Sequence, residues 1–282
     1  MSLLILAIIL LVLSIGASGA IYYFTHLYFS WYFLFVPILL IPILYVVIFG
    51  IYLIILFIIS LFLNQKKEIK NPNRFYYFWV RQTILQLLFF SRTKVKVIGK
   101  ELLEKNKRYL VVSNHISNFD PLLFVAKLKL QPLICVTKKE NLKIPICGPF
   151  IHRAGFISLD REDAHSGVQM VRKAADFIAR DLASIYICPE GTRSKTTELL
   201  PFHPGSFKIA TKVGTDIAVC YVENTNLIAK NFPFRSTKTI LKIAKVIPKE
   251  EVLEKRTTEL AFESEKIIKK EKEHLSNELF II

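Results

Sequence analysis

The sequence predicts a membrane hairpin of two helices, followed by a single α/β domain built on a mixed sheet. Three observations lead to this fold class. Residues 1–64 contain no Lys, Arg, Asp or Glu, although the chain of 282 residues has a formal net charge of +15. Short β-type runs alternate with helical runs in the remainder, as is typical of α/β layers. That remainder is also long enough to bury the core of one domain.

We divide the chain accordingly into three parts. A membrane hairpin is expected at residues 1–63, and a basic juxtamembrane segment with an amphipathic, interfacial helix at residues 64–94. The α/β domain, with a charged C-terminal helix, is expected at residues 95–282. The four cysteines form no CxxC pair. We interpret them as reduced, packed thiols, which agrees with a reducing cytosol.

Two uncharged runs make up the expected hairpin, residues 2–24 and 32–63. The stretch after Pro42 would form about 31 Å of helix, which matches a bilayer core of ~30 Å. We expect Pro37 and Pro42 to break the entry to this helix into an interfacial or re-entrant segment. A cleaved signal peptide is the alternative for the first run, but that run has no basic region before it and is too long.

Basic residues directly after the second run indicate the orientation. Lys66, Lys67, Lys70 and Arg74 follow it, whereas the link between the two runs carries no charge. By the positive-inside rule, the domain lies on the cytoplasmic face of the cell's inner membrane. Basic surface there is attracted to anionic lipid by about 1 kcal/mol per well-placed side chain. No nucleic-acid-binding motif accompanies the charge, so we do not expect nucleic acid as a partner.

The expected elements of the domain follow from the apolar runs and their spacing. Residues 75–90 form either a helix lying in the membrane interface or a helix packed on the domain core. Strands are expected at residues 94–99, 108–113, 133–138, 155–159, 183–188, 217–222 and 239–247. Helices are expected at residues 121–130, 164–180 and 205–213, and from about residue 249 to the end.

The stretch SNHISNFDP places a histidine five residues before an aspartate, between a strand and a helix. We expect Asp120 to cap the helix and Pro121 to lie in its first turn. Across this turn the carboxylate can reach Nδ1 of His115, which fixes the tautomer and leaves Nε2 to accept a proton. The pattern alone is equally compatible with a loop histidine and a simple cap.

A second polar motif, CPEGTRSK, follows another expected strand about 75 residues later. Glu190 offers a carboxylate, Gly191 allows a ligand to approach the backbone, and Arg193 offers a planar fork suited to phosphate. Such a turn is common when it stands alone. Two motifs of this kind, both at strand ends, point to one site.

Together these motifs resemble those of the glycerophospholipid acyltransferase family, typified by the bacterial 1-acylglycerol-3-phosphate acyltransferases. NHxxxxD of that family corresponds to Asn114, His115 and Asp120. A glycine-led run ending in arginine corresponds to GFISLDR, and FPEGTRS corresponds to ICPEGTRS, with Cys188 in place of phenylalanine. The fourth motif departs from the family, because Ala218 stands where a proline is usual.

The resemblance implies transfer of a fatty acyl group from a thioester to the sn-2 hydroxyl of lysophosphatidic acid, which yields phosphatidic acid. The co-substrate would be acyl-CoA or acyl carrier protein, with no cofactor and no metal. His115 would act as the base, and Ser117 as a covalent nucleophile is the less favoured alternative. Alternative functions are acylation of another lysolipid or aminoacyl lipid, or lipid binding without catalysis. The implied site comprises catalytic His115 and Asp120, and substrate-binding Asn114, Arg161, Glu190, Gly191, Thr192 and Arg193.

Overall fold

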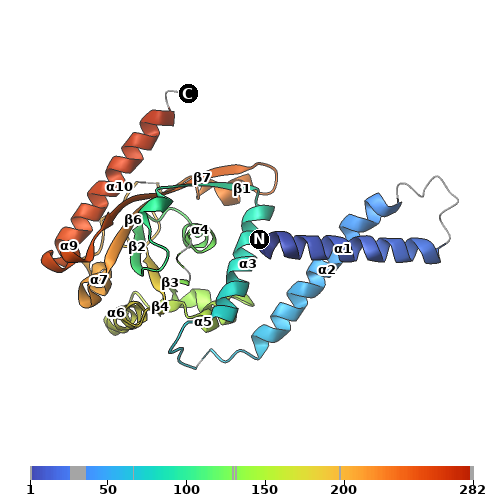
Figure 1. The fold of residues 1–282 in the computed structure, drawn as a ribbon, viewed down its shortest axis with the longest axis horizontal. Coiled ribbons are helices and arrows are strands. Elements are labelled where there is room, and N and C mark those ends of the chain that lie inside the picture. The colour runs from blue at the N-terminus through green and yellow to red at the C-terminus, as the bar shows by residue number, and fades with distance from the viewer. Residues whose placement is uncertain are drawn as a thin grey trace. The chain divides into compact units, whose positions relative to one another are not determined.

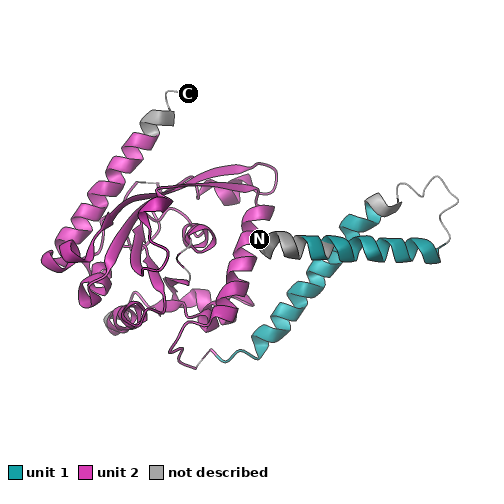
Figure 2. Ribbon diagram, in the orientation of Figure 1, with its two compact units in different colours: residues 1–64 teal, residues 65–282 magenta. Residues whose placement is uncertain are grey.

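The structure, a computed structural model, describes residues 2–25, 36–65, 67–128, 130, 132–196 and 198–279. It divides the chain into two compact units, residues 1–64 and residues 65–282 (Figure 2). Most of the link between the two apolar runs and the start of the second run lie outside the described residues. Each unit is therefore described by itself.

Helices α1 (Ser2–Phe24) and α2 (Val36–Leu61) form the first unit. Within its described residues, the one helix long and apolar enough to cross a membrane is Leu39–Leu61, with a mean hydropathy of 3.0, and Leu11–Phe24 is a shorter apolar stretch. The expected break before this helix is wrong, because α2 runs through Pro42 without interruption. A proline removes one backbone hydrogen bond, a loss that apolar helices in membranes tolerate. The hairpin itself stays a prediction.

Helix α3 (Arg74–Phe90) packs on the domain core through one face, and its place in the membrane interface stays a prediction. Tyr77, Val80, Ile84 and Leu88 recur at helical spacing and are buried in the second unit. Large apolar side chains remain exposed on the rest of the helix. These are Phe75, Phe78, Leu87, Phe89 and Phe90.

One seven-stranded mixed sheet forms the core of the second unit, which confirms the predicted α/β class (Figure 1). Its strands lie in the order β1-β7-β6-β2-β5-β3-β4. The five strands from β6 to β4 are parallel to one another, β7 is antiparallel to β6, and β1 is parallel to β7. The strands are β1 (Thr93–Ile98), β2 (Tyr109–Ser113), β3 (Leu133–Lys138), β4 (Ile157–Leu159), β5 (Ser184–Ile187), β6 (Asp216–Glu223) and β7 (Thr237–Ile247).

Helices cover both faces of this sheet. Helices α3 and α4 lie on one side, and α6, α7 and α10 lie on the other (Figure 1). This division follows from right-handed crossovers: the chain moves one way from β2 to β3 through α4, and the opposite way through α6 and α7. The remaining helices are α4 (Asp120–Lys127), α5 (Cys147–Ala154), α6 (Ala164–Ala179), α7 (Lys208–Val213), α8 (Leu227–Asn231), α9 (Lys249–Glu254) and α10 (Thr257–Leu279), with 3₁₀ turns at Lys100–Leu102, Lys139–Lys143 and Pro204–Phe207.

Each expected strand is present, whereas three expected helices differ in detail. The helix expected at residues 121–130 is Asp120–Lys127. The helix expected at residues 205–213 begins as the 3₁₀ turn Pro204–Phe207 and becomes α-helical at Lys208. The C-terminal helix is divided into α9 and α10. Ala218, in place of the family's proline, is fully buried in β6 between Val111 and Val246. Proline there would remove a hydrogen bond from a central strand.

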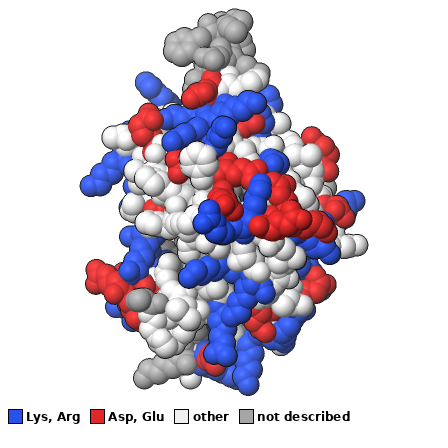
Figure 3. Space-filling model, turned by 90° about the vertical axis from the view of Figure 1, so that its left-hand side faces the viewer, with Lys and Arg blue, Asp and Glu red and all other residues white. Residues whose placement is uncertain are grey.

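The charged C-terminal helix packs through one apolar stripe and leaves its charges at the surface. Leu260, Ala261, Ile268 and Leu275 are buried. Acidic and basic side chains intermingle on the side of the molecule where α9 and α10 lie (Figure 3). Charged side chains on this face pair with one another across one helical turn, as Lys269 does with Glu265 at 2.8 Å.

Candidate active site

The polar motifs meet at the carboxyl ends of three neighbouring strands. Strands β6, β2 and β5 are adjacent and parallel, and the loops after them carry Thr225, His115 and Glu190. The carboxyl edge of parallel strands is where α/β folds commonly bind ligands. Both sequence motifs therefore contribute to one site.

His115 and Asp120 form the centre of this site. Nδ1 of His115 lies 2.8 Å from Oδ2 of Asp120, and the two side chains are 14% and 0% exposed. Because Nδ1 is held by the carboxylate, Nε2 is the nitrogen available for proton transfer. The arrangement has the geometry of a base with its orienting partner.

Asp120 differs from the expectation in one respect, because it is the first residue of α4 and Phe119 precedes the helix as its N-cap. Its Oδ2 accepts hydrogen bonds of 2.8 Å from the backbone N–H of both Ile116 and Ser117. Its Oδ1 accepts one from the Thr225 hydroxyl. The carboxylate therefore folds back over the preceding loop and does not cap its own helix.

Ser117, the alternative nucleophile, is also part of this loop. Its Oγ accepts a hydrogen bond from the backbone N–H of Phe119, at 3.2 Å. Its own N–H is donated to Asp120. These contacts give Ser117 a role in shaping the turn.

Asn114 joins the end of β2 to β6. Its amide donates to the carbonyl of Val222 at 2.9 Å and accepts from the N–H of Val222 at 2.8 Å. The side chain is only 5% exposed. Asn114 thus fixes the residue next to His115 through a pair of buried hydrogen bonds.

Glu190 holds the backbone of His115 from the other side. Its Oε1 accepts from the N–H of His115 at 2.7 Å, and its Oε2 accepts from the N–H of Leu200 at 3.2 Å. The carbonyl of His115 accepts from the N–H of Ser194 at 2.8 Å. Burial raises the pKa of Glu190 to about 7, although these donors and the charge of His115 lower it. A contact between Glu190 and substrate stays a prediction.

Glycine is required at position 191 by the backbone conformation and by the nearby side chain of His203. Its φ is +68°, and a Cβ atom there would lie 3.0 Å from Cδ2 of His203. A side chain at this position would be strained and would press on the His203 ring. The structure thus gives a reason for glycine that does not involve a ligand.

Cys188 was noted in the sequence only as a replacement for phenylalanine, yet it influences the base. It is partly exposed, its Sγ lies 3.1 Å from the hydroxyl of Tyr186, and it acts electrostatically on His115. Burial lowers the pKa of His115, but Cys188 and Asp120 together raise it to about 10. Its position directly before Pro-Glu-Gly was the available signal for this role.

Thr225 and Tyr186 were not predicted from the sequence, because their contacts join residues far apart in the chain. Thr225 lies 105 residues from Asp120 in the chain, and Tyr186 contacts Ser113 across two strands at 2.8 Å. Neither is part of a short motif.

The two motif arginines, Arg161 and Arg193, are exposed, and in the described part of the chain they are not fixed by contacts of the kind that hold His115. Arg161 is largely exposed and follows β4; partial desolvation of its guanidinium lowers its pKa, whereas Cys188 and Glu140 raise it. Thr192 and Arg193 are also exposed, in the loop after β5. Within the described residues Arg193 makes no ion pair. Glu190 accepts hydrogen bonds from backbone groups and does not pair with Arg193.

The four cysteines are unpaired as expected, but Cys147 is exposed and not packed.

The chain resembles known proteins over this same region. Residues 94–223 match the family model described as Acyltransferase. A 1-acyl-sn-glycerol-3-phosphate acyltransferase of Saccharomyces cerevisiae is 33% identical over 172 residues, which cover 59% of this chain and 56% of that protein. A protein of the same name from Borreliella burgdorferi is 32% identical over 164 residues, which cover 58% of this chain and 65% of that protein.

A solved structure agrees at the level of the fold. The crystal structure of the 1-acyl-sn-glycerophosphate (LPA) acyltransferase from Thermotoga maritima superposes with a TM-score of 0.58 at 21% identity, and covers 80% of this chain and 89% of that one. The matches to the curated relatives span just over half to about two thirds of their length. All of the motif residues described above lie between residues 94 and 223. Residues 94–223 therefore match the acyltransferase family model, and the predicted resemblance to the glycerophospholipid acyltransferases is confirmed.

Proposed function

We propose that the protein transfers a fatty acyl group from a thioester to the sn-2 hydroxyl of 1-acyl-sn-glycerol-3-phosphate, forming phosphatidic acid. The observation that carries this proposal is the 2.8 Å contact between His115 and a fully buried Asp120 within an acyltransferase-family domain. The names of the relatives from yeast and Borreliella supply the substrate. A protein that only binds lipid has no need of an oriented base.

The chemistry requires a base because a hydroxyl is a poor nucleophile at neutral pH. His115 accepts the proton of the sn-2 hydroxyl through Nε2 as the oxygen attacks the thioester carbonyl. The tetrahedral intermediate then collapses, the C–S bond breaks, and His115 returns the proton to the leaving thiolate. Asp120 keeps the ring in the required tautomer and stabilises the imidazolium. The donor in this scheme is acyl-CoA or acyl-acyl carrier protein, a co-substrate and not a resident cofactor.

Arg161 and Arg193 are proposed to bind the phosphate of the acceptor. Lysophosphatidic acid carries a phosphomonoester, and a guanidinium pairs with such a group through two parallel hydrogen bonds. The electrostatic influence of Cys188 on Arg161 supports a position close to the base. In the described residues, Arg193 has no acidic partner that would compete with a phosphate.

A membrane location follows for a substrate of this kind. Helix α2 is apolar enough to cross a bilayer, and basic residues follow its end. We propose that the two apolar helices anchor the chain in the inner membrane and that the domain faces the cytoplasm.

Replacing the base should remove activity without unfolding the protein. We expect His115→Ala to lower kcat by about 10² to 10⁴-fold, because general-base catalysis typically contributes that much. Asp120→Asn should approach the same loss, because the imidazole loses its preferred tautomer. The measurement is phosphatidic acid formation from lysophosphatidic acid and an acyl thioester, with circular dichroism on the same samples. Near-normal turnover by a folded His115→Ala protein would refute the mechanism.

The pH dependence should reflect the raised pKa of His115. The neutral imidazole becomes abundant only as pH rises through this pKa, so kcat/KM should fall toward low pH along a limb well above 6.5. Cys188→Phe should move this limb to lower pH, on the order of one unit, because one of the two raising influences is removed. Cys147→Ser is the control for loss of a cysteine. A limb near 6.5 in the wild type would contradict the assignment.

The arginines should affect the acceptor more than the donor. Arg161→Lys and Arg193→Lys keep the charge but lose the planar fork, at a cost of about 1.5 to 3 kcal/mol, or roughly ten- to a hundredfold in KM for lysophosphatidic acid. Arg172→Lys, an exposed position on α6, is the matched control. Steady-state kinetics for both substrates and a melting curve test this. Equal losses for donor and acceptor, with a lowered melting temperature, would show that the arginines only support the fold.

The membrane arrangement can be tested without any assay of catalysis. The full chain should stay with membranes after high-salt and carbonate washing, because apolar spans insert and are not merely adsorbed. Protease should cut the domain in inside-out vesicles and spare it in right-side-out vesicles. Release by salt alone, or cleavage in right-side-out vesicles, would exclude the proposed anchor or its orientation.

A further inference from the structure

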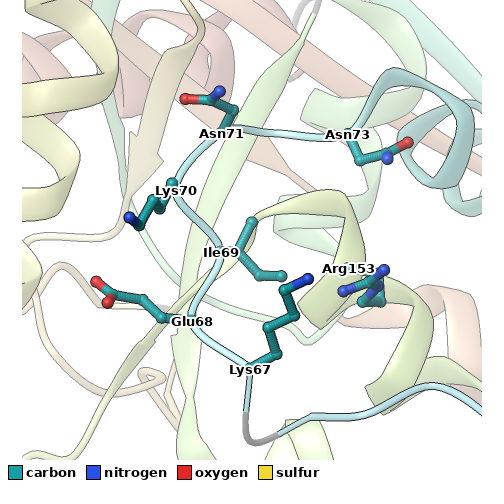
Figure 4. Close-up of a pocket in the computed structure, with 7 residues that line it drawn as sticks. All are labelled: Lys67, Glu68, Ile69, Lys70, Asn71, Asn73 and Arg153. Atoms are coloured by element: carbon teal, nitrogen blue, oxygen red, sulfur yellow. The ribbon is translucent and has the colours of Figure 1, made fainter.

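The segment that enters the second unit forms a surface pocket outside the active site. The pocket has a volume of about 400 Å³ and is lined by residues 67–71, Asn73 and Arg153 (Figure 4). These residues precede α3 or lie at the end of α5. None of them belongs to the loops after β2, β5 and β6 that carry His115, Glu190 and Thr225.

Three cations and one carboxylate line this pocket, so its formal charge is positive. Lys67 and Arg153 point toward one another, whereas Glu68 points away from both (Figure 4). In the part of the chain that the structure describes, neither Lys67, Lys70 nor Arg153 forms an ion pair. Glu68 acts electrostatically on Lys173 instead, where it opposes the lowering of the pKa by burial.

Two cations that face each other repel unless an anion lies between them. The guanidinium of Arg153 is also held 5.6 Å from the ring of Tyr76, so it is already oriented. Burial lowers the pKa of His152, and the neighbouring Lys173 and Arg153 lower it further, although its bond to the Lys67 carbonyl raises it. The pocket is thus a region of positive potential.

The backbone of the pocket is fixed by contacts to the rest of the unit. His152 Nε2 lies 3.0 Å from the carbonyl oxygen of Lys67, and Arg180 donates to Oδ1 of Asn71 at 2.6 Å and to the carbonyl of Lys70 at 3.4 Å. The side chain of Ile69 is only 8% exposed and anchors the centre of the segment. A site built in this way loses little entropy when it binds a ligand.

The position of the pocket in the chain indicates what it binds. Lys67 follows the end of α2 by six residues, a span of at most about 20 Å. Directly after the pocket, α3 exposes Phe75 and Phe78, which are 63% and 45% exposed. Basic residues followed by exposed aromatic residues are typical of a surface in contact with lipid headgroups.

We infer that this pocket binds the phosphate of an anionic membrane phospholipid, with Lys67 and Arg153 as its principal ligands. The occupant is a lipid of the bilayer that holds α2, and not the acyl acceptor of the active site. The inference rests on the membrane location proposed above and is independent of acyl transfer.

The test measures lipid binding by the full chain in detergent micelles. Fluorescent phosphatidylglycerol should bind more tightly than the matched phosphatidylcholine, by anisotropy titration. Lys67→Ala with Arg153→Ala should weaken phosphatidylglycerol binding roughly tenfold or more, because two cations close to the headgroup are lost. Lys266→Ala with Lys270→Ala removes the same charge from an exposed face of α10 and should leave binding unchanged.

Replacing Arg153 could also disturb the fold, because its guanidinium lies over the ring of Tyr76. A second pair of variants therefore leaves Arg153 in place. Lys67→Glu should abolish the preference for phosphatidylglycerol, whereas Lys270→Glu should retain it. Equal losses in the pocket and control variants would show that only net charge matters and would overturn the proposal. Displacement of the lipid by millimolar inorganic phosphate would also overturn it in favour of a site for soluble anions.

Discussion

The buried carboxylate of Asp120 is the group on which the rest of the site depends. It has no exposed surface, and an unpaired carboxylate in such a place would cost several kcal/mol of stability. Four donors surround it, two of them backbone N–H groups, with the His115 ring and the Thr225 hydroxyl completing the set. Because these donors come from the loops after β2 and β6, the carboxylate is satisfied only when both strands are in place. Formation of the sheet and formation of the base are therefore one event.

The imidazole owes its position to three strands and not to its own loop alone. Asn114 ties the loop to β6, and Glu190 and Ser194 hold the N–H and the carbonyl of His115 from the loop after β5. A histidine on an unsupported loop would sample many orientations, whereas these bonds leave the ring little freedom. Precise placement of this kind is what converts a proton acceptor into an effective base.

The fold was largely predictable from the sequence because its signals are local. Most of the strands are short, mainly apolar runs, although β1 and β7 also contain lysines, and the alternation with helices identified the α/β class. The order of the strands was not predictable, since it depends on pairings such as β1 with β7, far apart in the chain. Pro42 was misinterpreted because a proline that ends a helix in water can be accommodated in an apolar one.

The candidate site was predictable only in part, for a related reason. The pairing of His115 with Asp120 follows from a spacing of five residues, but the same letters also predicted a helix cap, which the structure does not contain. Gly191 was predicted to let a ligand approach, which stays a prediction, and the neighbour that excludes a side chain there is His203, twelve positions later in the chain. Contacts of Thr225 and Tyr186 arise from the tertiary structure and leave no pattern in the sequence.

Cys188 changes the character of the base without changing its identity. Ser113, Tyr186 and Cys188 form a chain of polar contacts, and a second contact joins His115 to Asp120. Cys188 and Asp120 both raise the pKa of the imidazole. A higher pKa makes the neutral ring a stronger proton acceptor but leaves less of it neutral at pH 7.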